Sequence, residues 1–371
     1  MFSYKLLGFT NKYYNLVLSR KCSVALNIRK TVFISSSKDI FTNLALEDWL
    51  YKNYDFKSHH VLLMWQSDPC VVIGRHQNPF IEANIAELKN ITKDGVSLAR
   101  RDSGGGTVFH DNGNLNLSFL STHECYNRKH NLEIISRAIL KECGLNIEIN
   151  KREDLVLDGC KVSGTASKLG RPNAYHHCTL LINANKDDLS RSLEKLDLNI
   201  ETNATQSVRS KIMNLSEKNP QISIANLIKT IGIEYMRTPA FQGKNKAVYP
   251  NIPQGFKYIN PSEGEFPGLN KIKEHFSSWK WIYGKTPKFV VKHDVPLPNL
   301  DTSGEKCVAI LTVENGLICK IEFVLPKLLD GLDIDENVDS QLKNSVFDLD
   351  TFIVLQKIFD EALNNKVSFV V

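Results

Sequence analysis

Three consecutive glycines, Gly104–Gly106, lie in the stretch RRDSGGGTVFHDNGNLNLSF, which runs from Arg100 to Phe119. Glycine has no Cβ, so three in a row weaken any helix or strand that contains them. Two arginines precede the glycines and His110 follows them, and bare backbone N–H groups beside arginines suit a phosphate or carboxylate ligand. We therefore predict a glycine-rich turn that enters a strand and closes on an anionic ligand. A structural β-bulge is the alternative.

Two common phosphate-binding motifs do not fit these glycines. The G-x-G of Gly104–Gly106 has Phe109 where the dinucleotide fingerprint requires its third glycine. Gly159 and Gly164 have the spacing of a P-loop, but Thr165 stands at the position of the lysine. Neither a dinucleotide site nor a P-loop is predicted.

Lys161, in the segment GCKVSGTASKLGR, lies on a predicted strand that leads into a loop rich in small residues. A charge there needs an anionic partner unless its amine reaches solvent, so a ligand contact and a surface lysine both stay open on this segment alone. Lys168 is expected to be a solvated loop lysine. His176 and His177 are adjacent on a strand and face opposite sides, which favours structural roles over a shared metal.

Hydrophobic periodicity predicts an α+β protein with a mostly antiparallel sheet. Asn112-Gly113 is predicted to close a β-hairpin, and residues 241–267 are predicted to form a long surface loop. Helices are expected over residues 43–53, 132–143, 222–235 and 349–363. Strands are expected at HVLLMWQ, CVVIGR, GVSLARR, TVFHD, NLNLSFL, LNIEI, DLVLDGCKVSG, HHCTLLINA, KFVVKHDV, KCVAILTVENG and ICKIEFVL.

The cysteines and the apolar runs exclude several classes of protein. The eight cysteines are scattered and form no C-x-x-C pair, which argues against a zinc ribbon, a thioredoxin motif and a disulfide scaffold. No run approaches the roughly 18 apolar residues that span a bilayer. A composition of 42% hydrophobic and 23% charged residues is ordinary for a globular protein.

The first 38 residues contain seven lysines and arginines and no acidic residue, which first occurs at Asp39. Basic, serine-containing and acid-free starts with interleaved apolar residues are typical of mitochondrial transit peptides. An ordinary basic tail is the alternative. Removing these seven charges from the net charge of +5 leaves about −2, so binding to nucleic acid loses its electrostatic support.

Five motifs occur in the order expected of one family. They are VVIGRHQNP, LARRDSGGGTVFHDNGNLNLSF, KVSGTASKLGR, YHHCTLLINA and WIYGKTPKF. Together they resemble the lipoate-protein ligase family and, within it, the mitochondrial lipoyltransferases of animals, from about Asn43 to Phe289. The resemblance implies an α+β catalytic domain of the biotin/lipoate ligase type, related to class II aminoacyl-tRNA synthetases, and a small α+β accessory domain. The expected ranges are 1–34 for the transit peptide, 35–270 for the catalytic domain and 275–371 for the accessory domain.

The resemblance also implies the site residues. Lys161 matches the family's essential lysine, and we expect it to stabilise charge on the carbonyl oxygen and the departing phosphate. The segment NATQS resembles the loop that closes on the adenylate. The implied contacts with lipoyl-AMP are Arg101, Ser103, Gly104, Gly105, Gly106, Thr107, Val108, Phe109, Arg152, Lys161, Thr179, Thr205 and Ser207.

The activity implied is transfer of a lipoyl group to a protein lysine. The expected donor is lipoyl-AMP, lipoyl-GMP or a lipoylated carrier protein, and Mg²⁺ is expected only if the protein activates lipoate itself, with no tightly bound metal. The expected acceptors are lipoyl domains of 2-oxoacid dehydrogenase acyltransferase subunits and the glycine cleavage H protein. A monomer in the mitochondrial matrix is expected, without nucleic acid or membrane partners.

Three other functions stay open. A complete ligase would make its own adenylate from lipoate and ATP or GTP. An octanoyltransferase would use a nucleophilic cysteine, but Thr205, Gln206 and Ser207 occupy the loop where one such class carries it. A non-catalytic scaffold would bind lipoyl-adenylate without turnover.

Overall fold

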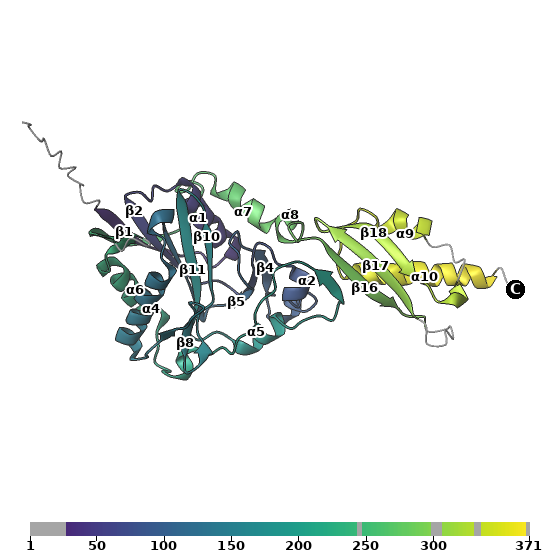
Figure 1. Cartoon of the computed structure of the whole chain (residues 1–371), viewed down its shortest axis with the longest axis horizontal. Helices are drawn as coiled ribbons and strands as arrows, with labels where there is room; N and C mark the ends of the chain where they lie inside the picture. Colours follow the sequence, from purple (N-terminus) through teal and green to yellow (C-terminus); the bar gives the residue numbers. More distant parts are fainter. Residues whose placement is uncertain (1–26, 243–246, 298–305, 330–334, 369–371) are drawn as a thin grey trace, which may run out of the picture.

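The computed structural model describes residues 27–242, 247–297, 306–329 and 335–368. Figure 1 shows a larger lobe, formed by the N-terminal part of the chain, and a smaller lobe at its C-terminal end. In the described residues, no helix combines the length and the apolar character that crossing a membrane requires.

A six-stranded sheet forms the centre of the larger lobe. Its order is β10 (Thr165–Leu169), β11 (Asn173–Leu181), β6 (Asn114–Thr122), β2 (His59–Trp65), β1 (Ile28–Ser35) and β15 (Asn251–Ile259). The first four strands pair antiparallel, whereas β1 pairs parallel with both neighbours. Alternate residues of β2 enter separate apolar clusters on the two faces, Leu62 on one and Leu63 on the other. The runs predicted as buried strands are confirmed.

Helices cover both faces of this sheet. α4 (Arg128–Cys143) and α6 (Ile224–Arg237) pack side by side on one face, and α1 (Ile40–Asn53) packs with α7 (Leu269–Ser277) on the other (Figure 1). α4 ends at Gly144 in the left-handed conformation, with a φ of 69°, which glycine adopts at little cost. The predicted helices at 43–53, 132–143 and 222–235 are confirmed.

A second, three-stranded sheet has the order β4 (Ser97–Arg100), β3 (Cys70–Ile73) and β5 (Val108–His110). The predicted hairpin at Asn112-Gly113 is wrong, because β5 pairs with β3 while β6 belongs to the larger sheet. The carbonyl of Gly113 accepts hydrogen bonds from the N–H groups of Ile182 and Asn183, at 3.1 and 2.9 Å. A Cβ on Gly113 would lie 2.0 Å from the carbonyl oxygen of Asn183. This glycine permits a close approach of two segments.

Shorter elements connect these sheets. The strands β7 (Glu148–Ile149), β8 (Leu155–Leu157) and β9 (Cys160–Lys161) form a small antiparallel sheet. The remaining elements of the larger lobe are α2 (Pro79–Glu82), α3 (Leu88–Ile91), α5 (Lys186–Ser192), α8 (Trp279–Ile282), β13 (Ala240–Gln242), β14 (Ala247–Tyr249), and the 3₁₀ turns η1 (His123–Cys125) and η2 (Leu215–Glu217).

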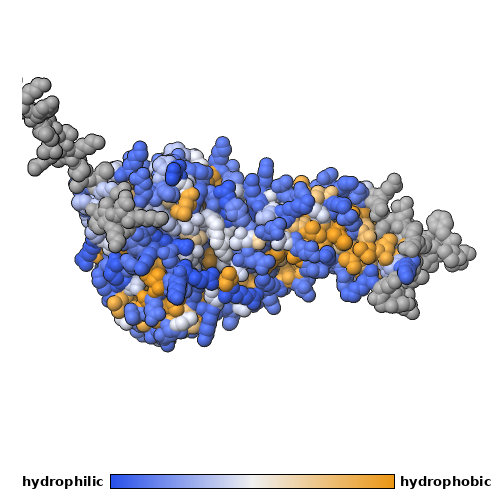
Figure 2. All heavy atoms as spheres, viewed as in Figure 1, coloured by the Kyte–Doolittle hydropathy of each residue, from blue (hydrophilic) through white to orange (hydrophobic). Residues whose placement is uncertain are grey.

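The smaller lobe contains a four-stranded antiparallel sheet. Its order is β12 (Ile200–Thr202), β16 (Phe289–Val295), β17 (Cys307–Glu314) and β18 (Leu317–Val324). The 3₁₀ turn η3 (Lys327–Leu329) and the helices α9 (Asp335–Leu342) and α10 (Asp350–Ser368) follow the sheet in the chain. Residues of both helices share a core cluster with alternate residues of the strands. Figure 2 shows apolar atoms gathered over this lobe, where Val324 is 55% exposed. The three strands predicted after residue 281 and the final helix are confirmed.

The prediction of a surface loop over residues 241–267 is wrong. β15 lies in this range and forms an edge of the six-stranded sheet. Pro253 and Gly255 hid this strand, because both residues are depleted in strand interiors. An edge strand tolerates proline, and the pairing of β1 with β15 shifts between Lys30 and Thr31, opposite this segment.

The predicted end of the transit peptide at residue 34 disagrees with the sheet. β1 lies between β2 and β15, and its Val32 is fully buried, so the larger lobe includes residues from Ile28. Arg29 and Lys30, which we counted with the basic start, therefore belong to a strand. Most of the predicted transit peptide, residues 1–26, lies outside the described residues.

The two lobes share residues across the predicted boundary near 270–275. Leu269, Phe276 and Trp281 enter the same apolar cluster as α1 in the larger lobe. In the opposite direction, Phe80 of α2 enters the core of the smaller lobe, with ring centroids 4.8 Å from Phe347 and 5.8 Å from Phe289. The division into two independently folding domains stays a prediction.

Candidate active site

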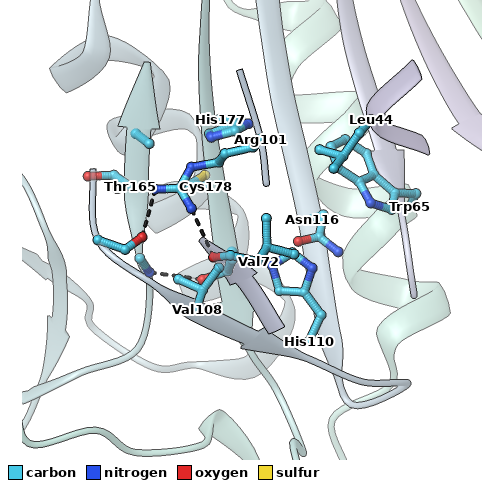
Figure 3. Close-up of a pocket in the computed structure, with 14 residues that line it drawn as sticks. Leu44, Trp65, Val72, Arg101, Val108, His110, Asn116, Thr165, His177 and Cys178 are labelled. Atoms are coloured by element: carbon cyan, nitrogen blue, oxygen red, sulfur yellow. Dashed lines mark hydrogen bonds between the residues drawn. The ribbon is translucent and has the colours of Figure 1, made fainter. Parts of the chain in front are cut away.

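A pocket lies where the six-stranded sheet, the three-stranded sheet and α1 meet (Figure 3). Its wall combines apolar side chains with one arginine, two histidines and one asparagine. Figure 3 shows Arg101, His177 and Thr165 on one side and Leu44 and Trp65 on the other. The lining residues are Leu44, Trp65, Val72, Arg101, Gly106, Val108, His110, Asn116, Gly164, Thr165, Ala166, His177, Cys178 and Thr179.

Arg101 organises the glycine turn. Its Nη2 donates to the carbonyl oxygens of Gly104 and Gly106, both at 2.7 Å, and its Nη1 donates to the carbonyl of Val72 at 3.1 Å. Its Nε donates to Ser103 Oγ at 3.0 Å. Burial lowers the pKa of Arg101 to about 10, so the guanidinium stays charged at neutral pH. Most of its N–H groups therefore hold the loop, and the side chain also forms part of the pocket wall.

The three glycines differ in what surrounds them. Gly105 has a φ of +91°, and a Cβ there would lie 2.9 Å from Arg101 Nη2 and 3.2 Å from the Cβ of Ala166. A Cβ on Gly106 would lie 3.1 Å from Ser207 Oγ, whereas one on Gly104 would have no described atom within 4 Å. The protein's own conformation and packing thus require Gly105 and restrict Gly106. Gly104 is the position whose missing side chain leaves open space.

The pocket also holds buried polar atoms without partners. Among the described residues, both ring nitrogens of His110 and the Nδ2 of Asn116 lack a hydrogen bond. Burial, with Arg101 and His177 nearby, lowers the pKa of His110 to about 3, so its imidazole is neutral at neutral pH. Unpaired buried polar groups destabilise a fold unless water or a ligand satisfies them. These atoms therefore mark the pocket as a place for a molecule that supplies hydrogen bonds.

A chain of hydrogen bonds lies beside Arg101. His177 Nε2 is 2.9 Å from Ser103 Oγ, and His177 Nδ1 is 3.0 Å from Glu47 Oε1. Burial alone would raise the pKa of Glu47, but His177, Ser118 and Lys168 lower it overall. Glu47 therefore keeps its negative charge inside the protein and orients the histidine.

The segment around NATQS reaches the glycine turn through a carboxylate. Glu82 accepts hydrogen bonds from the backbone N–H of Ser207 at 3.0 Å and from its hydroxyl. Ser207 Oγ in turn accepts from the N–H of Thr107 at 2.8 Å and from Gln77 Nε2 at 3.0 Å. We call Glu82, Gln77, Thr107 and Ser207 the Glu82 cluster. It fixes the predicted adenylate loop against the glycine turn, whereas the side chain of Thr205 is exposed.

Lys161 lies outside the pocket lining, three residues before Gly164. Its Nζ is 2.7 Å from Asp154 Oδ1, and both side chains are largely buried, 26% and 11% exposed. Its backbone forms a β-bridge with Ile212, in which Lys161 N donates to the carbonyl of Lys211 at 2.8 Å. We expected an anionic partner for this lysine from the sequence, and in the structure that partner is the carboxylate of Asp154. Arg152 is exposed on the turn before Asp154.

The structure brings only some of the predicted residues into the pocket. Val108 and Thr179 line it, and Thr179 Oγ1 accepts a hydrogen bond from the N–H of Gly164 at 2.9 Å. Phe109 is 2% exposed and joins an apolar cluster instead, because adjacent residues of β5 point to opposite sides. Arg100, which we expected beside the ligand, is fully buried elsewhere and donates to the carbonyls of Ile282 and Gln77.

Sequence reasoning did not place seven other residues of this region in the site, although it noted His110 beside the glycines and gave His177 a structural role. They are Glu47, Gln77, Glu82, His110, Asn116, Asp154 and His177. Strand alternation could have identified two of them, because alternate residues of a strand share a face. It puts His177 on the same face as Thr179, and His110 on the same face as Val108. Carboxylates on separate helices and turns leave no such pattern. Among the described residues, no group of three or more His, Cys, Asp or Glu could hold a metal ion.

The chain is similar to proteins that handle lipoate. The family model described as the lipoyl protein ligase A/B catalytic domain matches residues 39–235. The human protein named mitochondrial lipoyl amidotransferase LIPT1 is 40% identical over 318 residues, covering 84% of this chain and 81% of the human one. The lipoate-protein ligase A of Bdellovibrio bacteriovorus is 37% identical over 267 residues, covering 71% of this chain and 74% of its own.

Two solved structures share the fold. P. falciparum LipL1, solved in complex with lipoate, matches with a TM-score of 0.56 at 24% identity, covering 88% of this chain and 98% of its own. A lipoate-protein ligase A solved with bound ATP matches with a TM-score of 0.53 at 19% identity, covering 68% of this chain and 98% of its own. The expected mixed α+β fold of a lipoate ligase is confirmed.

Proposed function

The chain belongs to the family of lipoyl protein ligases and lipoyl amidotransferases, acyltransferases that attach lipoyl groups to proteins, and we propose that its donor is lipoyl-AMP held in the pocket beside Arg101. The observation that carries this proposal is the pocket itself. It joins an apolar wall, suited to an acyl chain, to buried polar atoms of His110 and Asn116 that lack partners in the described protein.

The chemistry follows from the donor, which is a mixed anhydride and already activated. The amine of an acceptor lysine attacks the lipoyl carbonyl, a C–N bond forms, the bond from the carbonyl carbon to the phosphate oxygen breaks, and AMP leaves. The amine loses a proton to solvent or to the leaving phosphate. Negative charge grows on the carbonyl oxygen and then on the phosphate, so a fixed cation close to both lowers the barrier.

We assign this cation to Lys161. In the described structure its ammonium pairs with Asp154, which holds the side chain in place. A phosphate would have to compete with Asp154 for the same ammonium. Arg101 would act by shaping the glycine turn, because most of its donors bind backbone carbonyls.

The Glu82 cluster would keep the adenylate in place. It holds the backbone of Ser207 against Thr107, next to the glycine turn. Closing a loop over an activated acyl group excludes water, which would otherwise hydrolyse it. We include Ser103–Val108, Thr179, Thr205, Ser207 and Arg152 among the proposed contacts, with Phe109 supporting the wall from behind.

The proposed acceptors are lipoyl domains of 2-oxoacid dehydrogenase acyltransferase subunits and the glycine cleavage H protein. We propose that the protein acts as a monomer in the mitochondrial matrix. The relative from Homo sapiens carries "mitochondrial" in its name, and residues 1–26 contain the greater part of the basic, acid-free start. A fusion of residues 1–27 to a fluorescent reporter that stays in the cytosol would contradict the location.

A complete ligase is the second candidate, because this chain matches most of the length of relatives named lipoate-protein ligase A. In that case lipoate and ATP or GTP would form the adenylate here, with Mg²⁺. A nucleophilic cysteine has less support. Cys178 lines the pocket, but burial raises its pKa to about 12, so its thiol stays protonated and unreactive.

One experiment tests the proposal. The protein is mixed with lipoyl-AMP and an isolated lipoyl domain, and mass spectrometry follows the domain. A parallel reaction replaces lipoyl-AMP by lipoate and ATP or GTP and follows pyrophosphate. We expect lipoylation in the first reaction. Lipoylation with pyrophosphate release in the second would make the protein a complete ligase, and no lipoylation in either would overturn the proposal.

A further inference from the structure

A second cavity lies on the opposite face of the six-stranded sheet from the active-site pocket. β6 separates the two, because Asn116 lines the pocket while Phe119 lines this cavity. The cavity measures about 30 Å³ and is lined by Lys30, His60, Phe119, Leu120, Ser121, Cys125, His130, Asn131, Ile134, Tyr235, Pro239 and Ala240. The proposed lipoyl transfer uses none of these residues.

Lys30 is an unusual lining residue, because it is 2% exposed and has no carboxylate within ion-pair distance among the described residues. Its Nζ donates to the carbonyl oxygens of Tyr235 and Thr238, at 3.0 and 2.6 Å, where α6 ends. The Nζ also lies 4.3 Å from the centroid of the Tyr235 ring, whose face attracts its charge. An ammonium has three N–H groups, so one remains without an oxygen or nitrogen acceptor among the described residues. Burial lowers the pKa of Lys30 to about 7.

His60 adds a second buried group that lacks a partner. It is 5% exposed, and no hydrogen bond within the described structure reaches its Nε2. Burial, then Lys30 and His59, lower the pKa of His60 to about 3, so the ring is neutral at neutral pH and can donate one N–H. Lys30 and His60 are thus two buried donors that line one cavity, and one acceptor placed between them would satisfy both.

The size and wall of the cavity limit that acceptor. A water needs about 10–15 Å³ of such space, so the cavity has room for one small group of two or three atoms. The wall mixes apolar side chains, Phe119, Leu120, Ile134 and Pro239, with polar ones, Ser121, His130, Asn131 and Tyr235. A small anion would compensate Lys30 and accept from His60 at once.

We propose that this cavity is a binding site for one small monovalent anion, of the size of a halide or formate, held by Lys30 and His60. The competing explanation is that Lys30 only caps the carbonyl end of α6, whose partial negative charge favours a cation. That explanation predicts an empty or water-filled cavity.

The direct test is a crystal of the full chain grown or soaked with sodium bromide, with anomalous diffraction data. We expect a bromide peak within contact distance of Lys30 Nζ, and the same peak absent from Lys30→Met crystals. A wild-type map without that peak would overturn the proposal.

A solution test keeps the proposal falsifiable if Lys30→Met does not fold or crystallise. Thermal unfolding is compared in sodium formate, chloride and the bulkier gluconate, at constant ionic strength. We expect formate and chloride to raise the melting temperature of the wild type above its value in gluconate, and His60→Phe to lose most of that difference. Lys257→Met, an exposed lysine of β15, is the control and should keep it. Equal differences in the wild type and His60→Phe would count against the site.

Discussion

Lys161 and Asp154 form a largely buried ion pair, so the charge proposed to drive transfer is held in position before any substrate arrives. We predict that Lys161→Ala lowers the rate of transfer from lipoyl-AMP by two or more orders of magnitude, about 3 kcal/mol, as loss of one preorganised donor does. Lys161→Arg should rescue poorly, because a planar fork cannot replace a compact ammonium. Stopped-flow or quenched transfer to a lipoyl domain measures both.

The control for Lys161 comes from its backbone partner. Lys211 is exposed, and no ion pair to it occurs within the described structure, so Lys211→Ala should transfer at the wild-type rate. Lys168, which we expected to be a solvated loop lysine, is unsuitable. It lies on β10, pairs with Asp48 at 3.2 Å and with Asp102, and these carboxylates outweigh burial to raise its pKa. Near-normal transfer by Lys161→Ala would remove the assigned role.

Gly104 gives the cleanest test of the glycine turn. A methyl group there meets no described atom within 4 Å, so Gly104→Ala should change the free energy of unfolding by no more than about 0.5 kcal/mol. If lipoyl-AMP lies against this backbone, the same methyl should weaken its binding about tenfold, measured by calorimetry. Gly264→Ala, which also has open space, is the control. Unchanged affinity would mean that the ligand does not approach Gly104.

Gly105→Val would separate an effect on binding from an effect on folding poorly. The left-handed φ of Gly105 and the contact with Arg101 Nη2 would strain the folded protein itself.

At the scale of elements, α2 supports the adenylate loop through Glu82. Glu82→Gln removes the charge of the acceptor that binds Ser207 twice, and loss of a charged hydrogen bond costs about 1.5–3 kcal/mol. We predict lipoyl-AMP binding at least tenfold weaker, together with a lower unfolding temperature, because the same hydrogen bonds are weakened in the free protein. Glu87→Gln, an exposed carboxylate 3.7 Å from Arg191, should bind normally. If both variants bind alike, the Glu82 cluster does not hold the loop for the ligand.

The helices and strands show which parts of the fold could be predicted from the sequence. Apolar residues that repeat with a period of two or 3.6 located the buried strands and the capped helices. Such residues share one face of their strand or helix, and that face packs against the core. β15 escaped, since its side chains are mostly exposed and Pro253 and Gly255 interrupt it. The pairing of β5 with β3 escaped as well, because turn residues report local geometry while pairing depends on distant partners. Glu82 was not found for the same reason, because Ser207 is 125 residues away along the chain. Asp154 lies only 7 residues before Lys161, but it lies outside any helix or strand, where no periodic pattern applies.

At the scale of the molecule, Arg100 ties the turn at residues 74–77 to the segment that leads into the smaller lobe. Its buried guanidinium donates to the carbonyls of Trp281 and Ile282 on one side and of Arg75 and Gln77 on the other. We predict that Arg100→Lys lowers the free energy of unfolding by about 3 kcal/mol, because one ammonium cannot reach acceptors on both sides and leaves buried carbonyls unpaired. Denaturant unfolding measures this loss. The exposed Arg191→Lys is the control, and equal stabilities would contradict the tie.

As a whole, the protein is proposed to hold lipoyl-AMP away from water and to pass its acyl group to a protein lysine. A single-turnover reaction tests this most directly: protein loaded with one equivalent of lipoyl-AMP is mixed with excess lipoyl domain, and AMP release and domain mass are followed together. We predict that the domain gains one lipoyl group for each AMP released, and that AMP release is slow without the domain. AMP release that is equally fast without the domain, or that leaves the domain unmodified, would contradict it.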